Sequence, residues 1–219
     1  RHPQPDQDPH LAHLHRVTAA RPQWPELFVL AYDHRAQFED LARQAGVDGA
    51  RLPGLKQLLN AVVADVERDP GCEGRMGVLI DGRIGEAALH DATGRGWWLG
   101  RPIERPGSRP LRFDGTHSLA TQLVHWPREQ VVKCLVFYHP DDAAALRAEQ
   151  DEWLQQVWEA TRASGHELLL EVIPPKDMLA PGDTGEAVLR AIRHFYDIGL
   201  KPEWWKVGTM ASRHWDVLD

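Results

Sequence analysis

Short apolar runs alternate along the chain with longer segments of helical periodicity. Six runs of strand length lie at residues 27–32, 76–81, 97–104, 131–138, 167–175 and 203–208. The first run, LFVLAY, is continuous and rich in β-forming residues, which predicts a strand buried on both faces. Both ends of this run adjoin polar or proline residues, as expected for a strand that enters and leaves a core.

Four helical segments separate these strands, at residues 35–45, 53–68, 141–165 and 185–198. In the second helix an apolar set recurs at the spacing of a helix face that packs on a core; it comprises Leu55, Leu58, Leu59, Val62, Val63 and Val66. Gly165 and Gly199 stand where glycine commonly ends a helix.

Strands that alternate with helices predict an α/β fold with a parallel sheet and helical crossovers. A doubly wound open sheet and a closed barrel share this pattern, so periodicity does not choose between them. The chain has neither GxGxxG after a strand nor GxxxxGK[ST], which removes the two commonest nucleotide-binding loops of doubly wound sheets.

Residues 1–26 contain five prolines and little periodicity, which predicts a linker before a domain that starts near Leu27. The length of 219 residues suits one domain but falls short of the roughly 250 residues typical of an eightfold βα barrel.

The charge balance of 25 basic and 32 acidic residues gives a net charge of −7, so no general field attracts nucleic acid or an anionic membrane. No apolar run reaches the roughly 18 residues of a membrane helix, and the polar start is no signal peptide. We therefore expect a cytoplasmic protein. Cys72 and Cys134 are too few for a disulfide framework and read as reduced thiols.

Charged residues inside apolar strands are the most informative feature. Lys133, Glu171 and Lys206 each interrupt such a run, where an ion is costly unless it is paired. Asp33 and Arg35 follow the first strand, at the end where parallel α/β folds build their sites. Taken singly, each lysine reads equally well as an edge residue whose ammonium reaches solvent.

Together, two lysines and two carboxylates on four strands have the composition that a Schiff-base enzyme needs. A second cation and desolvation favour the neutral nucleophilic amine, and a nearby carboxylate moves protons. Strand parity places Lys133 with Leu135 and Phe137, and Glu171 with Leu169 and Ile173; the opposite faces are equally apolar, so parity does not decide the orientation.

The motifs AYDHR, VVKCLVFYHPDD, ELLLEVIPP and WWKVG resemble, in order and spacing, class I aldolases of the tagatose-1,6-bisphosphate aldolase type. That resemblance implies a (β/α)8 TIM barrel. It also implies Lys206 as the Schiff-base lysine, Glu171 as the general acid/base, Asp33 and Lys133 as residues that orient the hydroxyl and tune the amine, and Arg35 as a substrate contact.

A longer set of motifs, which adds GVLIDGRIGEAAL and GRPIERPGSRPL, is similar to the aldolase-like domain fused behind bacterial 5-dehydro-2-deoxygluconokinase in myo-inositol catabolism. This resemblance implies cleavage of 6-phospho-5-dehydro-2-deoxy-D-gluconate to dihydroxyacetone phosphate and 3-oxopropanoate, with no cofactor. Residues 1–26 would then be a linker or the tail of a carbohydrate kinase module, and 27–219 a barrel incomplete after its sixth strand, with the phosphate site beyond Asp219.

Three further residues are candidate substrate contacts. Arg83 and Arg101 lie near the ends of the second and third strands, where a guanidinium can hold a carboxylate or phosphate, although a structural ion pair with Asp81 or Glu104 is an equal reading. His139 follows the fourth strand and faces either the substrate or solvent.

Two other classes of function stay open. One is a metal-dependent aldolase or hydrolase, for which the sequence offers His10, His13, His15, His34, His117, His125 and His139. The other is a non-catalytic regulatory or assembly domain of a kinase fusion. The open edges of a six-stranded sheet also favour pairing with another copy of the chain.

Overall fold

The computed structural model describes residues 13, 24, 26–115, 118–179 and 184–217. The expected linker at 1–26 lies outside these residues, except for residues 13, 24 and 26. Contacts divide the chain into two compact units, the first made of residues up to 102 with 126–132, and the second of residues 103–125 with 133–219.

Six strands form one sheet in the order in which they occur along the chain. They are β1 (Phe28–Ala31), β2 (Met76–Leu79), β3 (Trp98–Pro102), β4 (Gln130–Phe137), β5 (Leu168–Ile173) and β6 (Trp204–Lys206). The pairs β1/β2, β2/β3 and β5/β6 are parallel. The predicted α/β class is confirmed, and the consecutive order is that of successive βα units, whereas doubly wound sheets reverse their order part of the way across.

The four predicted helices are present as α2 (Ala36–Gln44), α3 (Leu52–Val66), α6 (Ala144–Ser164) and α7 (Thr184–Asp197). Three shorter helices were not predicted: α4 (Glu86–Ala92), α5 (Leu119–Val124) and α8 (Ser212–Trp215). Segments of four to seven residues are too short to show a helical period.

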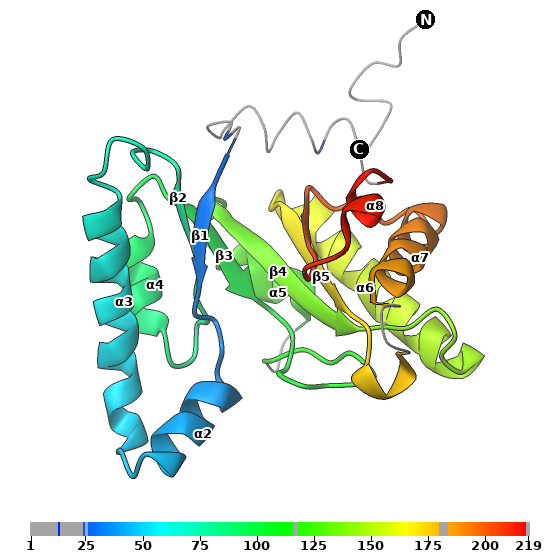
Figure 1. The fold of residues 1–219 in the computed structure, drawn as a ribbon, viewed down its shortest axis with the longest axis horizontal. Helices are drawn as coiled ribbons and strands as arrows, with labels where there is room; N and C mark the ends of the chain where they lie inside the picture. The colour runs from blue at the N-terminus through cyan, green and yellow to red at the C-terminus, as the bar shows by residue number, and fades with distance from the viewer. Residues whose placement is uncertain (1–12, 14–23, 25, 116–117, 180–183, 218–219) are drawn as a thin grey trace, which may run out of the picture. The chain divides into compact units, whose positions relative to one another are not determined.

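In the first unit, α3 and α4 pack together beside β1, β2 and β3 (Figure 1). The core between them is built from buried apolar side chains, among them Val78, Ile80, Leu89 and Leu99. The prediction that β1 is buried on both faces is wrong, because Phe28, Val29 and Leu30 are all exposed. The strand lies at an edge of the sheet, so it lacks a second neighbouring strand to cover it.

The buried face of α3 also differs from the predicted one. Leu52, Lys56, Asn60 and Val63 are buried, whereas four members of the predicted apolar set, Leu55, Leu58, Val62 and Val66, are exposed. The buried set keeps helical spacing but contains two polar residues, which find partners inside the unit. Apolar periodicity alone therefore predicts the helix correctly and its core face incorrectly.

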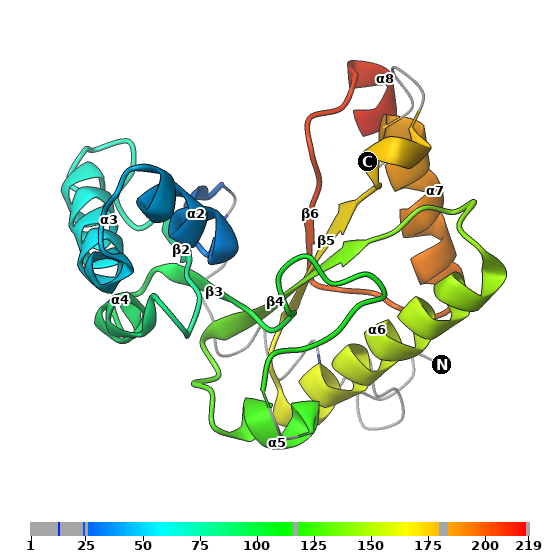
Figure 2. The same ribbon diagram turned by 90° about the horizontal axis from the view of Figure 1, so that it is seen from below.

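In the second unit, α6 and α7 lie beside β5 (Figure 2). Cys134 and Val136 of β4 are fully buried, and Leu168, Leu170 and Val172 of β5 are almost or completely buried. Leu135, Phe137 and Ile173, on the alternate faces, are only half-buried. The parity that the sequence left open is thereby settled: Lys133 and Glu171 share the less covered face of their strands.

Within the described ranges, none of the helices combines the length and the apolar character that crossing a bilayer requires.

Candidate functional site

Four ionised side chains of the second unit form a row of alternating charge. The Lys206 Nζ lies 2.5 Å from Glu171 Oε1, and the Lys133 Nζ lies 3.1 Å from Glu171 Oε2. The same Lys133 ammonium donates a hydrogen bond of 3.1 Å to Glu104 Oε1. Of the predicted catalytic residues, Glu171 therefore contacts both Lys133 and Lys206.

Backbone pairing between neighbouring strands places these four charged side chains next to one another. Glu171 and Lys206 are register partners across the parallel β5/β6 pair, so their side chains leave the sheet on the same face. On the other side, the Ile103 N–H donates to the Lys133 carbonyl at 3.0 Å, which extends the pairing of β4 beyond the end of β3 and brings Glu104 alongside Lys133.

Glu104 was not predicted as a site residue. Its Oε1 accepts from Lys133, and its Oε2 accepts the Leu135 N–H at 3.2 Å. The carboxylate is thus held by the charge and by the backbone of β4. Glu104 ends the predicted third strand, where the sequence offered it only as an ion-pair partner of an arginine. The available signal was that a buried lysine in β4 needs counter-charge from a neighbouring strand.

Burial is graded along the row. Lys133, Glu104 and Glu171 are buried, whereas the Lys206 side chain is 36% exposed and is the one that a solute reaches. Burial, together with the carboxylates of Glu104 and Glu171, raises the pKa of Cys134 well above its ordinary value, so this thiol stays protonated and is no competing nucleophile.

A cavity of about 510 Å³ adjoins Lys206. Its walls are mainly apolar and aromatic and come from α7, β6 and the segment that follows β6; they include Ile192, Tyr196, Trp205, Trp215 and Val217, with Arg193 as a second cation. Cavities with mostly apolar walls and a few placed polar groups are the usual form of small-molecule sites.

Asp33 and Arg35 belong to the first unit, and both are buried at the end of β1 as predicted. The Lys56 ammonium is attracted by the Asp33 carboxylate and repelled by the Arg35 guanidinium. The expectation that Asp33 and Arg35 join Lys133, Glu171 and Lys206 in one site stays a prediction.

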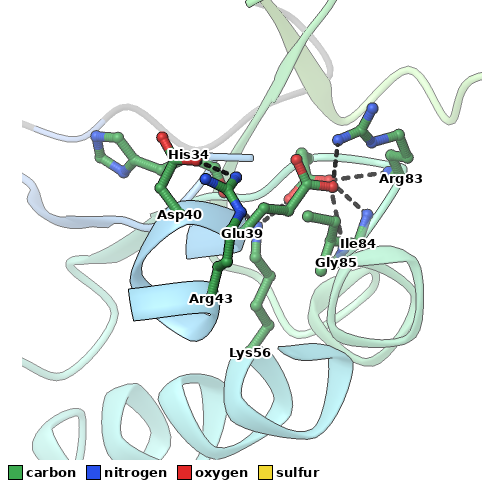
Figure 3. Close-up of polar contacts among 9 residues, drawn as sticks. His34, Glu39, Asp40, Arg43, Lys56, Arg83, Ile84 and Gly85 are labelled. Carbon is green, nitrogen blue, oxygen red and sulfur yellow. Dashed lines mark hydrogen bonds and ion pairs between the residues drawn. The ribbon is translucent and has the colours of Figure 1, made fainter. Parts of the chain in front are cut away.

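Lys56 is the centre of a second polar cluster, drawn in Figure 3. It is fully buried, forms an ion pair with the equally buried Asp81, and donates to the His34 carbonyl at 2.9 Å. The second oxygen of Asp81 accepts the N–H groups of Arg83 at 3.0 Å and Ile84 at 2.7 Å. Burial lowers the pKa of Lys56, and the Asp81 carboxylate opposes that shift.

The two arginine candidates have partners in the first unit other than the predicted ones. The Arg83 guanidinium pairs with Glu39 at 2.8 Å on the surface (Figure 3), and only its backbone contacts Asp81. The Arg101 guanidinium lies 3.9 Å from the ring centroid of Trp126 and packs over Gly82, where a side chain would collide with it. The ion pairs expected with Asp81 or Glu104 are therefore replaced by a surface pair and a cation–π contact.

His139 is buried in the second unit. Its backbone N–H donates to Asp142 Oδ2 at 3.1 Å, and its Nδ1 accepts the Asp141 N–H at 3.2 Å. The Arg109 guanidinium binds the other oxygen of Asp142. These contacts shape the turn after β4, and a role of His139 towards substrate stays a prediction.

Among the residues that the structure describes, no three histidine, cysteine or acidic side chains are placed to hold a metal ion together. His10, His15 and His117, which the metal hypothesis also named, lie outside those residues.

Comparison with known families gives one finding. A family model with the description "Uncharacterized protein conserved in bacteria (DUF2090)" matches residues 1–219. No curated protein matches the chain.

Proposed function

The chain belongs to the DUF2090 family of bacterial proteins, and from that premise we propose that it is a class I aldolase whose Schiff base forms on Lys206. The single observation that carries this proposal is the contact of Glu171 with two lysines, one buried and one open to a cavity. In this arrangement the buried Lys133 holds one oxygen of the carboxylate, and the other oxygen faces a lysine that is partly exposed.

In the proposed reaction the Lys206 ammonium first gives a proton to Glu171, whose Oε1 lies 2.5 Å away. The neutral amine attacks the ketone carbon of the substrate, and the carbinolamine takes a proton back and loses water to leave a protonated imine. This step needs a base and then an acid at the same place, and Glu171 is the group within reach of the reacting nitrogen.

Carbon–carbon cleavage follows from the charge of the imine. A base removes the proton from the hydroxyl on the β carbon, two carbons from the imine carbon. The bond between this β carbon and the α carbon breaks, and its electron pair moves into the imine to form an enamine. The aldehyde leaves, the enamine carbon takes up a proton, and water hydrolyses the imine to return ketone and free Lys206. Glu171 is the proposed proton carrier throughout.

Lys133 acts through its charge in this proposal. It holds Glu171 Oε2 at 3.1 Å and leaves Oε1 directed at Lys206. Glu104 keeps Lys133 in place through one oxygen and the β4 backbone through the other. The row therefore fixes the geometry of one carboxylate oxygen and one amine, which is the positioning that proton transfer requires.

The finer parts of the proposal rest on the sequence resemblance. They are an eightfold (β/α)8 barrel, a phosphorylated keto-sugar acid as substrate, contacts from Arg35, Arg83, Arg101 and His139, and a carbohydrate kinase module on the same polypeptide. The substrate proposed is 6-phospho-5-dehydro-2-deoxy-D-gluconate. Asp33 is proposed to orient the hydroxyl that loses its proton.

The test is product formation by the full chain. The chain is incubated with the phosphorylated keto-sugar acid, and dihydroxyacetone phosphate is followed by its enzymatic reduction, with the Lys206→Met variant in parallel. We expect turnover by the parent and none by Lys206→Met. Arg213→Met, which removes an exposed cation of α8, serves as the matched control. Equal turnover by the parent and Lys206→Met would refute the proposal.

A further inference from the structure

The exposed side of α3 carries a continuous apolar stripe. Leu55, Leu58, Val62 and Val66 are 40%, 60%, 46% and 39% exposed, on the side of the helix opposite the buried Lys56 and Asn60. Single exposed apolar residues are common, but four that follow one another at helical spacing form a patch that usually marks an interface.

A hollow of about 630 Å³ adjoins the N-terminal half of this stripe. Its lining comprises Val47, Ala50, Arg51, Leu52, Gly54, Leu55 and Leu58. The floor is shallow because Ala50 and Gly54 have little or no side chain. In the C-terminal half of the same stripe the surface is raised and not hollow, because the side chains of the exposed Val62 and Val66 project there.

We propose that the chain forms a homodimer in which α3 packs antiparallel against α3 of a second copy, with Leu58 on the twofold axis. In this arrangement, residues equally far before and after Leu58 face each other. Val62 of one copy then lies against Gly54 of the other, and Val66 lies against Ala50, so the projecting valines enter the hollow. The two halves of the stripe are complementary in size.

The charged residues on either side of Leu58 independently favour the same antiparallel register of the two α3 helices. Asp65 lies seven residues after Leu58 in α3, about two helical turns away and so on the same line of the helix. Arg51 lies seven residues before Leu58, at the end of the 3-10 turn Gly49–Arg51 that runs directly into α3, so it stands near the same line. The antiparallel arrangement brings Arg51 of each copy opposite Asp65 of the other. A parallel arrangement would instead place each charge against its own like charge.

Within one copy, Asp65 already pairs with Arg68 at 2.9 Å, and both side chains are more than two-thirds exposed. Such a pair contributes little by itself. In the proposed dimer Asp65 also faces Arg51 of the other copy, so each end of the interface carries three charges of alternating sign. Such charges fix orientation and register more than affinity.

The first test is the mass of the full chain in solution, by light scattering after gel filtration and by sedimentation over a range of concentrations. We expect a dimer. The Leu58→Asp variant, which places two carboxylates together on the axis, should be monomeric where the parent is fully dimeric. Leu58 is largely exposed, so the variant should fold, as circular dichroism would verify. Val124→Asp, at an exposed position on α5, should remain dimeric.

A charge exchange tests the register. Arg51→Glu and Asp65→Arg should each weaken the dimer at least tenfold, and the double variant should regain most of that loss because the paired charges are exchanged between copies. Three results would each overturn the proposal. The parent could be monomeric at every concentration, the Leu58→Asp variant could stay dimeric, or the double variant could dimerise no more tightly than the single variants.

Discussion

The Lys206 ammonium and the Glu171 carboxylate face each other at 2.5 Å across the β5/β6 pair, at matching positions in the register. Because both are strand residues, the distance between them is set by backbone pairing and not by a flexible loop. A proton donor and acceptor held in this way are ready for repeated transfer, which the proposed aldolase needs at several steps.

Replacement of Glu171 by glutamine should separate binding from turnover. The amide keeps the shape of the side chain but neither accepts nor returns a proton, so kcat should fall by about 10²- to 10⁴-fold with little change in KM. Steady-state kinetics of Glu171→Gln measures both constants. An equal effect on kcat and KM would argue against the acid/base role.

Removal of Glu104 should destabilise the second unit. Glu104→Leu leaves the buried Lys133 with less counter-charge, and breaking a buried pair on one side costs about 3–5 kcal/mol of unfolding free energy. Urea denaturation gives the value. Glu104→Gln should lose less, because its amide oxygen still accepts the Leu135 N–H.

The double variant Glu104→Leu/Lys133→Met supplies the control. Replacing both members of a buried pair by apolar residues is often nearly neutral, so the double variant should be more stable than Glu104→Leu. If Glu104→Leu unfolds at the same urea concentration as the parent, the charge row contributes nothing to the fold.

Lys56 should make stability rise with pH. Burial lowers the pKa of Lys56 in the folded chain, so at pH values below 10.5 and above the folded value the unfolded chain binds more protons. The unfolding free energy of the parent relative to Lys56→Met should therefore increase as the pH rises through this window. Denaturation at several pH values from 7.5 to 10.5 tests the sign over the whole range that the window can occupy. A constant or falling difference would show that the Lys56 pKa is not lowered.

Gly185 should be intolerant of a side chain. A Cβ at this position would collide with Nδ1 of the buried His214, which packs α8 against the first turn of α7. Gly185→Ala should displace α8 and cost about 1–3 kcal/mol, as overpacking does. The fluorescence of Trp215 on α8 reports the displacement, and an unchanged spectrum with unchanged stability would contradict this packing.

Sequence predicts those residues of the site whose charged side chains interrupt an apolar strand. Lys133, Glu171 and Lys206 stand out because the cost of burying an ion demands partners, and those partners are one another. The strands themselves are predictable because short, continuous apolar runs bounded by turn residues are typical of buried strands.

Glu104 and Lys56 escape prediction for different reasons. Glu104 ends the predicted third strand, and the sequence offered only an arginine as its partner. The bond from the Ile103 N–H to the Lys133 carbonyl is what brings it to Lys133. Lys56 lies in a leucine-rich helix, where the apolar residues indicate the wrong buried face. Its spacing from Leu52 and Asn60, four residues either way, is the available signal.

The most direct test of the proposed chemistry is covalent trapping. The full chain is treated with sodium borohydride in the presence of dihydroxyacetone phosphate, digested and mapped by mass spectrometry. The account predicts one reduced adduct, on the peptide that carries Lys206, and its loss in Lys206→Met, while Glu171→Gln forms it more slowly. No mass shift in the parent, or an adduct that persists in Lys206→Met, would contradict the assignment of Lys206 as the Schiff-base lysine.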